Sequence, residues 1–448
     1  MYSVLSTKYG VYSAPARKLT LDPSPTLSET SASVEASRQP LPRNVILLGW
    51  ASLLNDVASE MLYPLLPTFL ITVLGGNKAW LGTIDGIAET ASSLLKLWSG
   101  ARSDVTTSRK RFVVAGYGLA AIARPLMGLV GYPWQLLSLR VLDRVGKGIR
   151  TAPRDALIAE AAEEGTRGRA FGFHRAMDHL GAAIGPLFAF AFLWLWPNQL
   201  RLLFLVAIVP AIPILFLVAF GVRENPRAAP PSADGGLKLS LKPFDGRFRL
   251  YLVALAVFTL GNSSDSFLLV RAGELGVPTA WLPILWCVFH VAKSVLSYAA
   301  GRWIDRVGAR PLIWVGWLIY AATYLAFAFA TAAWHAWALF LVYAIFYALT
   351  EPSEKALVAN LVGAENRGLA YGWYNLTIGI GALPASMIFG FVYQSAGPLA
   401  AFGMGAGLAL VAAALLIGVR GRPDKSPAVN EPPNPPLSAR ESPPSGGT

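Results

Sequence analysis

Acidic residues occur in pairs inside the first two long apolar runs of this sequence. Asp56 and Glu60 stand four residues apart, so in a helix they would share one face, and Asp85 and Glu89 repeat the spacing. If these runs cross a membrane, each ionisable side chain at mid-depth costs about 2.5–3.5 kcal/mol on insertion scales. A carboxylic acid can avoid part of that cost by alternating between a neutral and a charged form. We therefore expect Asp56 and Glu60 to carry protons.

A later apolar run adds cations to these acids. Arg140, Asp143, Arg144 and Lys147 all lie in this run, the fourth predicted span. Arg140 is the predicted electrostatic partner of the first acid pair, and Asp143 and Arg144 complete the predicted proton-coupling set. The alternative is that opposite charges here only neutralise one another and fix the orientation of the helix.

The composition shows which solvent surrounds the chain. Of 448 residues, 54% are hydrophobic and only 14% are charged, which is too apolar for an ordinary soluble protein of this length. The net charge of +12 comes from basic residues scattered over short loops. That scatter argues against a nucleic-acid partner, which would need a basic face, and favours orientation in a lipid bilayer.

About twelve apolar runs are long enough to cross a bilayer, which takes roughly 20 residues per helix. They begin near residues 45, 79, 112, 134, 168, 201, 248, 280, 311, 334, 367 and 398. Alternate loops are rich in Arg and Lys, which predicts that those loops and both termini are cytoplasmic. The predicted divisions are an N-terminal disordered tail, a six-helix bundle, a linker, a second six-helix bundle and a C-terminal disordered tail, over residues 1–43, 44–221, 222–247, 248–420 and 421–448.

The two halves repeat each other. Arg167-Gly168 and Gly181-Ala182 recur as Arg367-Gly368 and Gly381-Ala382, at a constant offset of two hundred residues. Chance similarity between apolar segments would not also match an Arg-Gly pair in register. The repeat indicates an ancestral duplication, and parallel repeats of this kind place a transporter's substrate site between the halves.

Four short motifs lie in predicted spans 4 and 5 and in two of the loops between spans. Residues 301–310 read GRWIDRVGAR, residues 140–146 read RVLDRVG, residues 181–186 read GAAIGP, and residues 100–104 with 109–111 form a weaker copy of the first. With these motifs the chain resembles the major facilitator superfamily, and within it the proton-coupled drug antiporters, over nearly all of residues 45–420. The predicted conformational residues are Gly100, Asp104, Gly181, Gly185, Pro186, Gly301, Asp305, Arg306, Gly308 and Arg310.

The motifs also depart from the family pattern. In the span 4 motif, Asp143 and Arg144 stand where the family has Gln and Gly. The first-half loop lacks the paired Arg and the Gly, and the Gly pair expected after Pro186 is absent. The resemblance thus covers the whole helical region, with an unusually charged fourth span.

The resemblance implies an all-α membrane protein with 12 transmembrane helices in two pseudo-symmetric six-helix bundles. It also implies a water-filled central cavity that Asp56, Glu60, Arg140 and Arg144 face, and a loop in which Asp305 could latch the halves. The alternatives are plain helix packing for the glycines and a solvated turn for the loop. The predicted cavity residues are Glu89, Arg175, Asp178, His179, Asn262, Asp265, His290, Lys293, Trp373, Tyr374 and Asn375.

Metal chemistry is a second hypothesis. Spans 5 and 8 should meet between the halves, where Asp178, His179 and His290 would offer the nitrogen and oxygen atoms that a first-row divalent metal takes. Histidines that only pack are the alternative. Cys287 is the single cysteine, so the sequence has no cysteine-based metal site. We predict no resident metal and no cofactor, and we retain export of a divalent metal or a metal chelate as the alternative function.

The leading functional hypothesis is secondary active transport of a small solute, with proton-coupled efflux by alternating access. No motif of a metalloprotease, an α/β-hydrolase or a phosphate-binding loop is present, so we predict that the chain is not an enzyme. A non-transporting membrane receptor is the remaining alternative. The predicted partners are a small-molecule substrate, protons and the lipid bilayer, for a functional monomer in the cell inner membrane.

Overall fold

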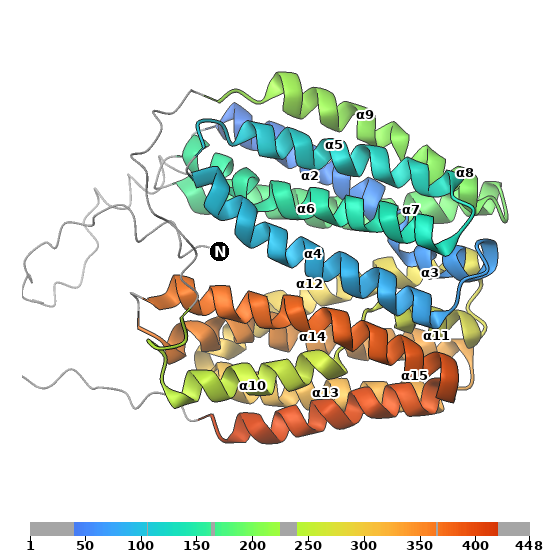
Figure 1. Cartoon of the computed structure of the whole chain (residues 1–448), viewed down its shortest axis with the longest axis vertical. Helices are drawn as coiled ribbons and strands as arrows, with labels where there is room; N and C mark the ends of the chain where they lie inside the picture. Colours follow the sequence, from blue (N-terminus) through green and yellow to red (C-terminus); the bar gives the residue numbers. More distant parts are fainter. Residues whose placement is uncertain (1–39, 105, 163–165, 225–239, 364–365, 420–448) are drawn as a thin grey trace, which may run out of the picture.

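The computed structural model describes residues 40–104, 106–162, 166–224, 240–363 and 366–419. Nearly all of the two predicted tails and most of the predicted linker lie outside the described residues. Every regular element within these ranges is helical, which confirms the predicted all-α class. Figure 1 shows the helices in two bundles, one from each half of the chain.

The first half begins with a broken rod, in which α2 (Arg43–Glu60), η1 (Tyr63–Leu65), α3 (Leu66–Thr68) and η2 (Phe69–Val73) follow one another. Single rods come next: α4 (Lys78–Asp104), α5 (Lys110–Leu126) with η3 (Met127–Leu129), α6 (Pro133–Ala161) and α7 (Arg167–Leu195). The half closes with α8 (Leu200–Val206), α9 (Ile208–Phe216) and η5 (Leu217–Gly221).

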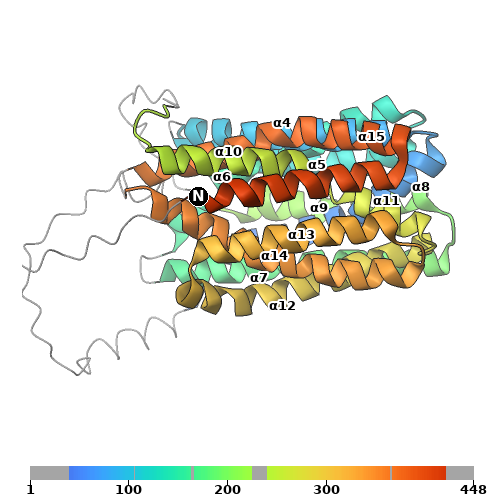
Figure 2. The same ribbon diagram turned by 90° about the horizontal axis from the view of Figure 1, so that it is seen from below.

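The second half has the same order of rods. It starts with α10 (Gly246–Gly261) and α11 (Ser266–Glu274), followed by η6 (Thr279–Trp281) and α12 (Leu282–Val307). Next are α13 (Ala309–Phe329), α14 (Ala333–Leu361) and α15 (Arg367–Ile417). Figure 2 shows these helices lying side by side along one common direction.

Nine helices among the described residues are long and apolar enough to cross a membrane. One of them, α15, has 51 residues and contains Gly397 at φ 81°, where two helices meet across a kink. At 1.5 Å per residue such a length exceeds twice the 30 Å of a bilayer core, so α15 supplies two spans. Helices α4 and α6 are 27 and 29 residues long but are too charged for that count. These two features account for the difference between nine helices and the twelve predicted spans.

Local sequence explains where several rods begin and end. The Asp245 carboxylate accepts hydrogen bonds from the backbone N–H groups of Arg247 and Phe248, both at 3.1 Å, and so caps α10. Pro133 occupies the first turn of α6, where its missing N–H costs nothing. Gly308 separates α12 from α13 at φ 87°, a conformation that side chains with a Cβ rarely adopt.

The two halves meet along two pairs of helices, α4 against α15 and α7 against α12. Gly82 and Gly86 let α4 approach α15, because a Cβ at either position would meet the backbone of Ser386 or Leu383. We call the end where α2 begins and α15 ends the basic end, and the end where α4 begins and α7 ends the opposite end. In Figure 1 the basic end is on the left.

Candidate substrate cavity between the two halves

A cavity of about 440 Å³ lies between the two bundles and is lined by both. Its first-half wall comes from the end of α2 and from η1, α4 and α6. Its second-half wall comes from α10, the segment after it, α12, α14 and α15. The charged residues of the first-half wall are Glu60, Asp85, Glu89, Arg140, Arg144 and Lys147. Polar residues of the second-half wall include Asn262, Asp265, His290, Glu351, Glu354 and Tyr374.

Asp143 is buried behind the first-half wall and holds two arginines. Arg124 Nε lies 2.9 Å from Asp143 Oδ1, and Arg140 Nη1 lies 3.3 Å from Asp143 Oδ2. Arg124 also donates to the carbonyl oxygen of Asn55 at 2.9 Å, which ties α5 to α2. Arg140 makes no ion pair with Asp56 or Glu60 among these contacts. The prediction that Arg140 is the partner of those two acids therefore does not hold in this conformation.

The first acid pair divides between two environments. Glu60 lines the cavity and accepts a hydrogen bond from Trp286 Nε1 of α12 at 2.9 Å. Asp56 is not among the lining residues; it accepts a hydrogen bond from Asn55 Nδ2 at 2.8 Å and lies beside Gly181 of α7. Four residues advance a helix by about 400°, so the two side chains point about 40° apart, and α2 ends at Glu60. The predicted shared face therefore does not put both acids in the cavity.

Asp178 lies on the α2 side of α7 rather than in the cavity. It accepts a hydrogen bond from the Ser52 hydroxyl, and its Oδ2 lies 3.6 Å from His174 Nδ1 and 3.8 Å from an Arg175 nitrogen. Arg175 and His179 are exposed. These three predicted cavity residues are therefore misplaced, because the repeat and the apolar pattern do not reveal which face of α7 turns inward.

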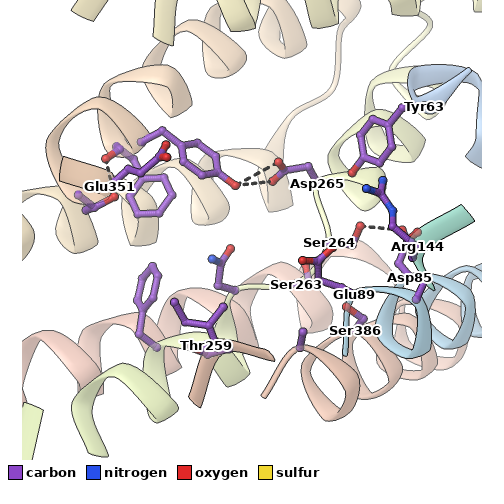
Figure 3. Close-up of a pocket in the computed structure, with 18 of the residues that line it drawn as sticks. Tyr63, Asp85, Glu89, Arg144, Thr259, Ser263, Ser264, Asp265, Glu351 and Ser386 are labelled. Atoms are coloured by element: carbon purple, nitrogen blue, oxygen red, sulfur yellow. Dashed lines mark hydrogen bonds between the residues drawn. The ribbon is translucent and has the colours of Figure 1, made fainter. Parts of the chain in front are cut away.

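The chain leaves the helical conformation between α10 and α11, over Asn262–Ser264. The Ser264 hydroxyl donates to Asp85 Oδ2 across the halves at 2.6 Å. Asp265 accepts hydrogen bonds from Tyr343 at 2.7 Å and from Tyr347 at 3.1 Å. Figure 3 shows Asp85, Glu89 and Arg144 on one side of the pocket and Glu351 on the other, with Asp265 between them.

The other predicted cavity residues have mixed outcomes. Glu89, Asn262, Asp265, His290 and Tyr374 line the cavity, and Tyr374 donates to Glu354 at 2.8 Å.

Three predicted residues lie elsewhere. Lys293 lies behind the wall, 3.0 Å from Glu351 and over the ring of Tyr347. Trp373 donates to the Ser240 carbonyl, and Asn375 donates to a carbonyl of its own helix. Trp373 is half-buried against the hydrophobic core and Asn375 is exposed, so the prediction that these two residues line the cavity is wrong.

Sequence reasoning missed several groups that define the site. Tyr343 and Tyr347 read as packing aromatics, and Arg124 stands alone in an otherwise apolar run. The polar stretch Asn262–Asp265 was a usable signal, because Asn, Ser and Asp inside an apolar run favour a break in the helix.

The metal hypothesis loses its geometric basis. Among the residues that the structure describes, no group of three or more His, Cys, Asp and Glu side chains could hold a metal ion. His290 packs against Trp286, with ring centroids 4.7 Å apart, while Asp178 faces α2 and His179 is exposed. The expected convergence of Asp178, His179 and His290 is therefore wrong.

The motif residues are only partly described. The side chains of Asp104 and Asp305, and residue Gly301, fall outside the description of burial and contacts. Arg306 is exposed, and Arg310 Nη2 donates to the carbonyl oxygen of Ile417 at 2.9 Å, which ties α13 to the end of α15.

The glycine motif of α7 is fully described. Gly181 and Gly185 lie against the α2 backbone at Leu53 and Val57, where a Cβ would collide, and Gly100 faces Ala152. The buried Pro186 follows within α7.

Comparisons with known proteins identify the family. The sequence matches the family model described as Major Facilitator Superfamily over residues 48–289 and 279–444. The chain belongs to the major facilitator superfamily. The membership predicted from the motifs is confirmed, and the chain is a multi-pass integral membrane protein of a transporter family.

Relatives and solved structures agree with this assignment. An uncharacterized MFS-type transporter of Methanocaldococcus jannaschii is 33% identical over 383 residues, covering 84% of this chain and 95% of that protein. The multidrug resistance protein MdtH of Escherichia coli is 23% identical over 329 residues, covering 72% and 79%. The nucleoside transporter NupG has a TM-score of 0.70 at 13% identity, covering 84% and 98%, and a POT peptide transporter has 0.72 at 13%, covering 87% and 97%. The two structures share the fold alone.

Proposed function

We propose that this superfamily member is a proton-coupled secondary transporter that exports a small organic solute from the central cavity by alternating access. The observation that supports the coupling most directly is the pair of hydrogen bonds that cross between the halves to cavity acids. Glu60 accepts from Trp286 and Asp85 accepts from Ser264. Protonation of either acid changes a contact that the halves must break when they rock apart.

The conformation described here is closed at the opposite end. Lys78 Nζ lies 2.7 Å from Glu274 Oε1, and its backbone N–H donates to Gln394 at 3.2 Å. The rings of Phe190 and Trp281 also meet there, with centroids 5.2 Å apart. Farther along the axis, Thr90 donates to the Gly379 carbonyl at 2.6 Å. With the basic end in the cytoplasm, as the loop charges predict, these contacts would close the cavity toward the outside.

Charge on the two acids stabilises that closed end. A hydrogen bond to a carboxylate is roughly twice as strong as a bond between neutral groups. Deprotonated Glu60 and Asp85 therefore favour contact between the halves, and protonation weakens both bonds and favours opening toward the opposite end.

Two features support export rather than uptake. The motif with Gly181, Gly185 and Pro186 resembles that of antiporters, and a 23% identical relative is named a multidrug resistance protein. Of the two acids predicted to carry protons, only Glu60 lines the cavity, and Asp56 does not. We therefore take Glu60 as the first proton carrier and Asp85, which also lines the cavity, as the second.

The test is solute-dependent proton movement in proteoliposomes that carry a trapped pH indicator. The wild-type protein should move protons when a transported solute is added, and Glu60→Gln should abolish uphill transport while exchange of preloaded solute continues. Glu431→Gln, beyond the last predicted span, is the matched control and should behave as the wild type. Full proton-coupled transport in the Glu60→Gln, Asp85→Asn double variant would refute the coupling role.

A further inference from the structure

The charged groups of the cavity differ in whether the protein supplies their partners. Five lining acids accept hydrogen bonds or ion pairs from described residues of the protein. They are Glu60, Asp85, Asp265, Glu351 and Glu354. A substrate that entered the cavity would therefore gain little from these acids without first displacing a protein group.

Two cations of α6, in contrast, have side chains to which the protein supplies no bonded partner. Arg144 is 9% exposed, and the side chains of Arg144 and Lys147 make no hydrogen bond or ion pair with any residue that the structure describes. Asp143, the nearby buried acid, is already shared by Arg124 and Arg140. A buried cation without a bound partner is costly, so a ligand that supplies the missing acceptors gains that free energy.

Glu89 is the remaining acid near these two cations. It interacts electrostatically with both Arg144 and Lys147, although it pairs with neither. Glu89 therefore leaves the side-chain donors of both cations without a bonded acceptor, and a ligand oxyanion could supply it. The unfilled part of the site thus suits a monoanion.

The rest of the cavity suits an apolar body. Phe258, Phe346 and Trp286 line the second-half wall, opposite the α6 cations, and Leu255 adds an aliphatic surface. A volume of about 440 Å³ falls within the range of pockets that bury drug-sized molecules. A solute with an oxyanion at one end and an aromatic or aliphatic body at the other would fill both parts.

We propose that the transported solute is a small organic monoanion whose oxyanion binds between Arg144 and Lys147 and whose apolar body lies against the aromatic second-half wall. This inference rests on the proposed function, since it names the substrate class of the same cavity. The planar guanidinium of Arg144 can bind a carboxylate or phosphate group through two parallel N–H bonds, and Lys147 adds a point charge.

The first experiment compares three probes with the same phenyl body on the purified full-length protein. The probes are 3-phenylpropanoate, which is an anion, phenylalanine, which is a zwitterion, and 2-phenylethylamine, which is a cation. The anion should raise the melting temperature and bind in equilibrium dialysis, and the cation should do neither. Preferential binding of the cation, or no binding of the anion, would overturn the proposal.

Variants then separate the site from the fold. Arg144→Gln and Lys147→Gln should each weaken binding of 3-phenylpropanoate by about tenfold or more, the range expected for a lost bond to a charged group. Glu89→Gln should strengthen it severalfold, because the competing acid is gone, and a failure to fold cannot produce tighter binding. The exposed Lys242→Gln is the control and should bind as the wild type. Unchanged affinity in the Arg144→Gln, Lys147→Gln double variant would contradict the proposal.

Flux measurements distinguish this inference from the proposed function. Uptake of 3-phenylpropanoate into proteoliposomes without proton movement would refute proton coupling and leave the anion site intact. Proton-coupled flux of 2-phenylethylamine, with none for the anion, would refute the anion site and leave the coupling intact.

Discussion

Helices α6 and α14 occupy equivalent places in the two halves but carry different side chains at matching positions. Their bounds, Pro133–Ala161 and Ala333–Leu361, differ by two hundred residues at each end, the same offset as the sequence repeat. Yet α6 carries Asp143 and Lys147 where α14 carries Tyr343 and Tyr347. The duplicated backbone places these side chains at equivalent positions along the two helices, and each half then supplies a different kind of wall.

The difference assigns a separate task to each wall. At the α6 wall the Asp143 carboxylate pairs with Arg124 and Arg140. The side chains of Arg144 and Lys147 have no bonded partner, so this wall presents positive charge to the cavity. On α14 the two tyrosine hydroxyls fill the acceptors of Asp265, and their rings extend an aromatic cluster that includes Phe289 and Phe346. A wall with unpaired cations, facing a wall of aromatic rings and acids that the protein already pairs, is suited to a solute that has one anionic and one apolar end.

The largest predicted effect compares equivalent positions 143 and 343. Asp143→Asn removes the charge that pairs with Arg124 and Arg140, and breaking a buried ion pair costs about 3–5 kcal/mol. Tyr343→Phe removes one hydrogen bond to Asp265, which keeps Tyr347, and should cost about 1 kcal/mol. Thermal unfolding of the detergent-purified variants measures both. Equal losses at the two positions would show that α6 and α14 depend on their polar groups to the same extent.

Much of this architecture follows from sequence patterns. Apolar runs, the repeat and loop charges predict the all-helical class and the order of rods, because lipid allows few alternatives for a backbone that must satisfy its own hydrogen bonds. The charges of α6 stand out for the same reason, since each is costly in an apolar run.

The side of each helix that faces the cavity is harder to predict. Asp56 and Glu60 have the same sequence signature, but the end of α2 turns only Glu60 inward. Asp178 and His179 are neighbours on α7, yet Asp178 accepts a hydrogen bond from Ser52 of α2 and His179 is exposed. The partners Tyr343 and Tyr347 come from another rod, and no local pattern records which residues tertiary packing brings together.

An intermediate effect is expected at the glycines that pack against the two helices. A Cβ at Gly116 would meet the carbonyl oxygen of Gly146 and the backbone of Arg150, neither of which can move aside. A Cβ at Gly316 would meet the Thr350 methyl group, a side-chain atom, and would lie 3.6 Å from the nearest backbone atom of α14. Gly116→Ala should therefore cost about 1–3 kcal/mol, and Gly316→Ala should cost clearly less. A larger loss of thermal stability for Gly316→Ala than for Gly116→Ala would contradict this prediction.

The smallest effect concerns the contact through which the unlike halves hold together at the opposite end. Lys78 and Glu274 are partly exposed, with side chains 23% and 32% accessible, so their pairing contributes at most about 1 kcal/mol to the closed state. The backbone N–H of Lys78 also donates to Gln394 of α15 at 3.2 Å, and this bond between the halves remains when the Lys78 side chain is changed. Lys78→Gln should shift the equilibrium only slightly toward opening at that end.

The single cysteine of the chain can report this shift, so no cysteine has to be introduced. Cys287 is buried on α12 and lies 3.6 Å from the carbonyl oxygen of Ala183 on α7, so separation of the halves would expose its sulfur. The rate of maleimide labelling should rise roughly two- to fivefold in Lys78→Gln, as expected for a change below about 1 kcal/mol in the closed state. Lys242→Gln, an exposed lysine far from this contact, should label at the wild-type rate. A labelling rate that is unchanged in Lys78→Gln would mean that the remaining contacts hold the opposite end closed without the ion pair between Lys78 and Glu274.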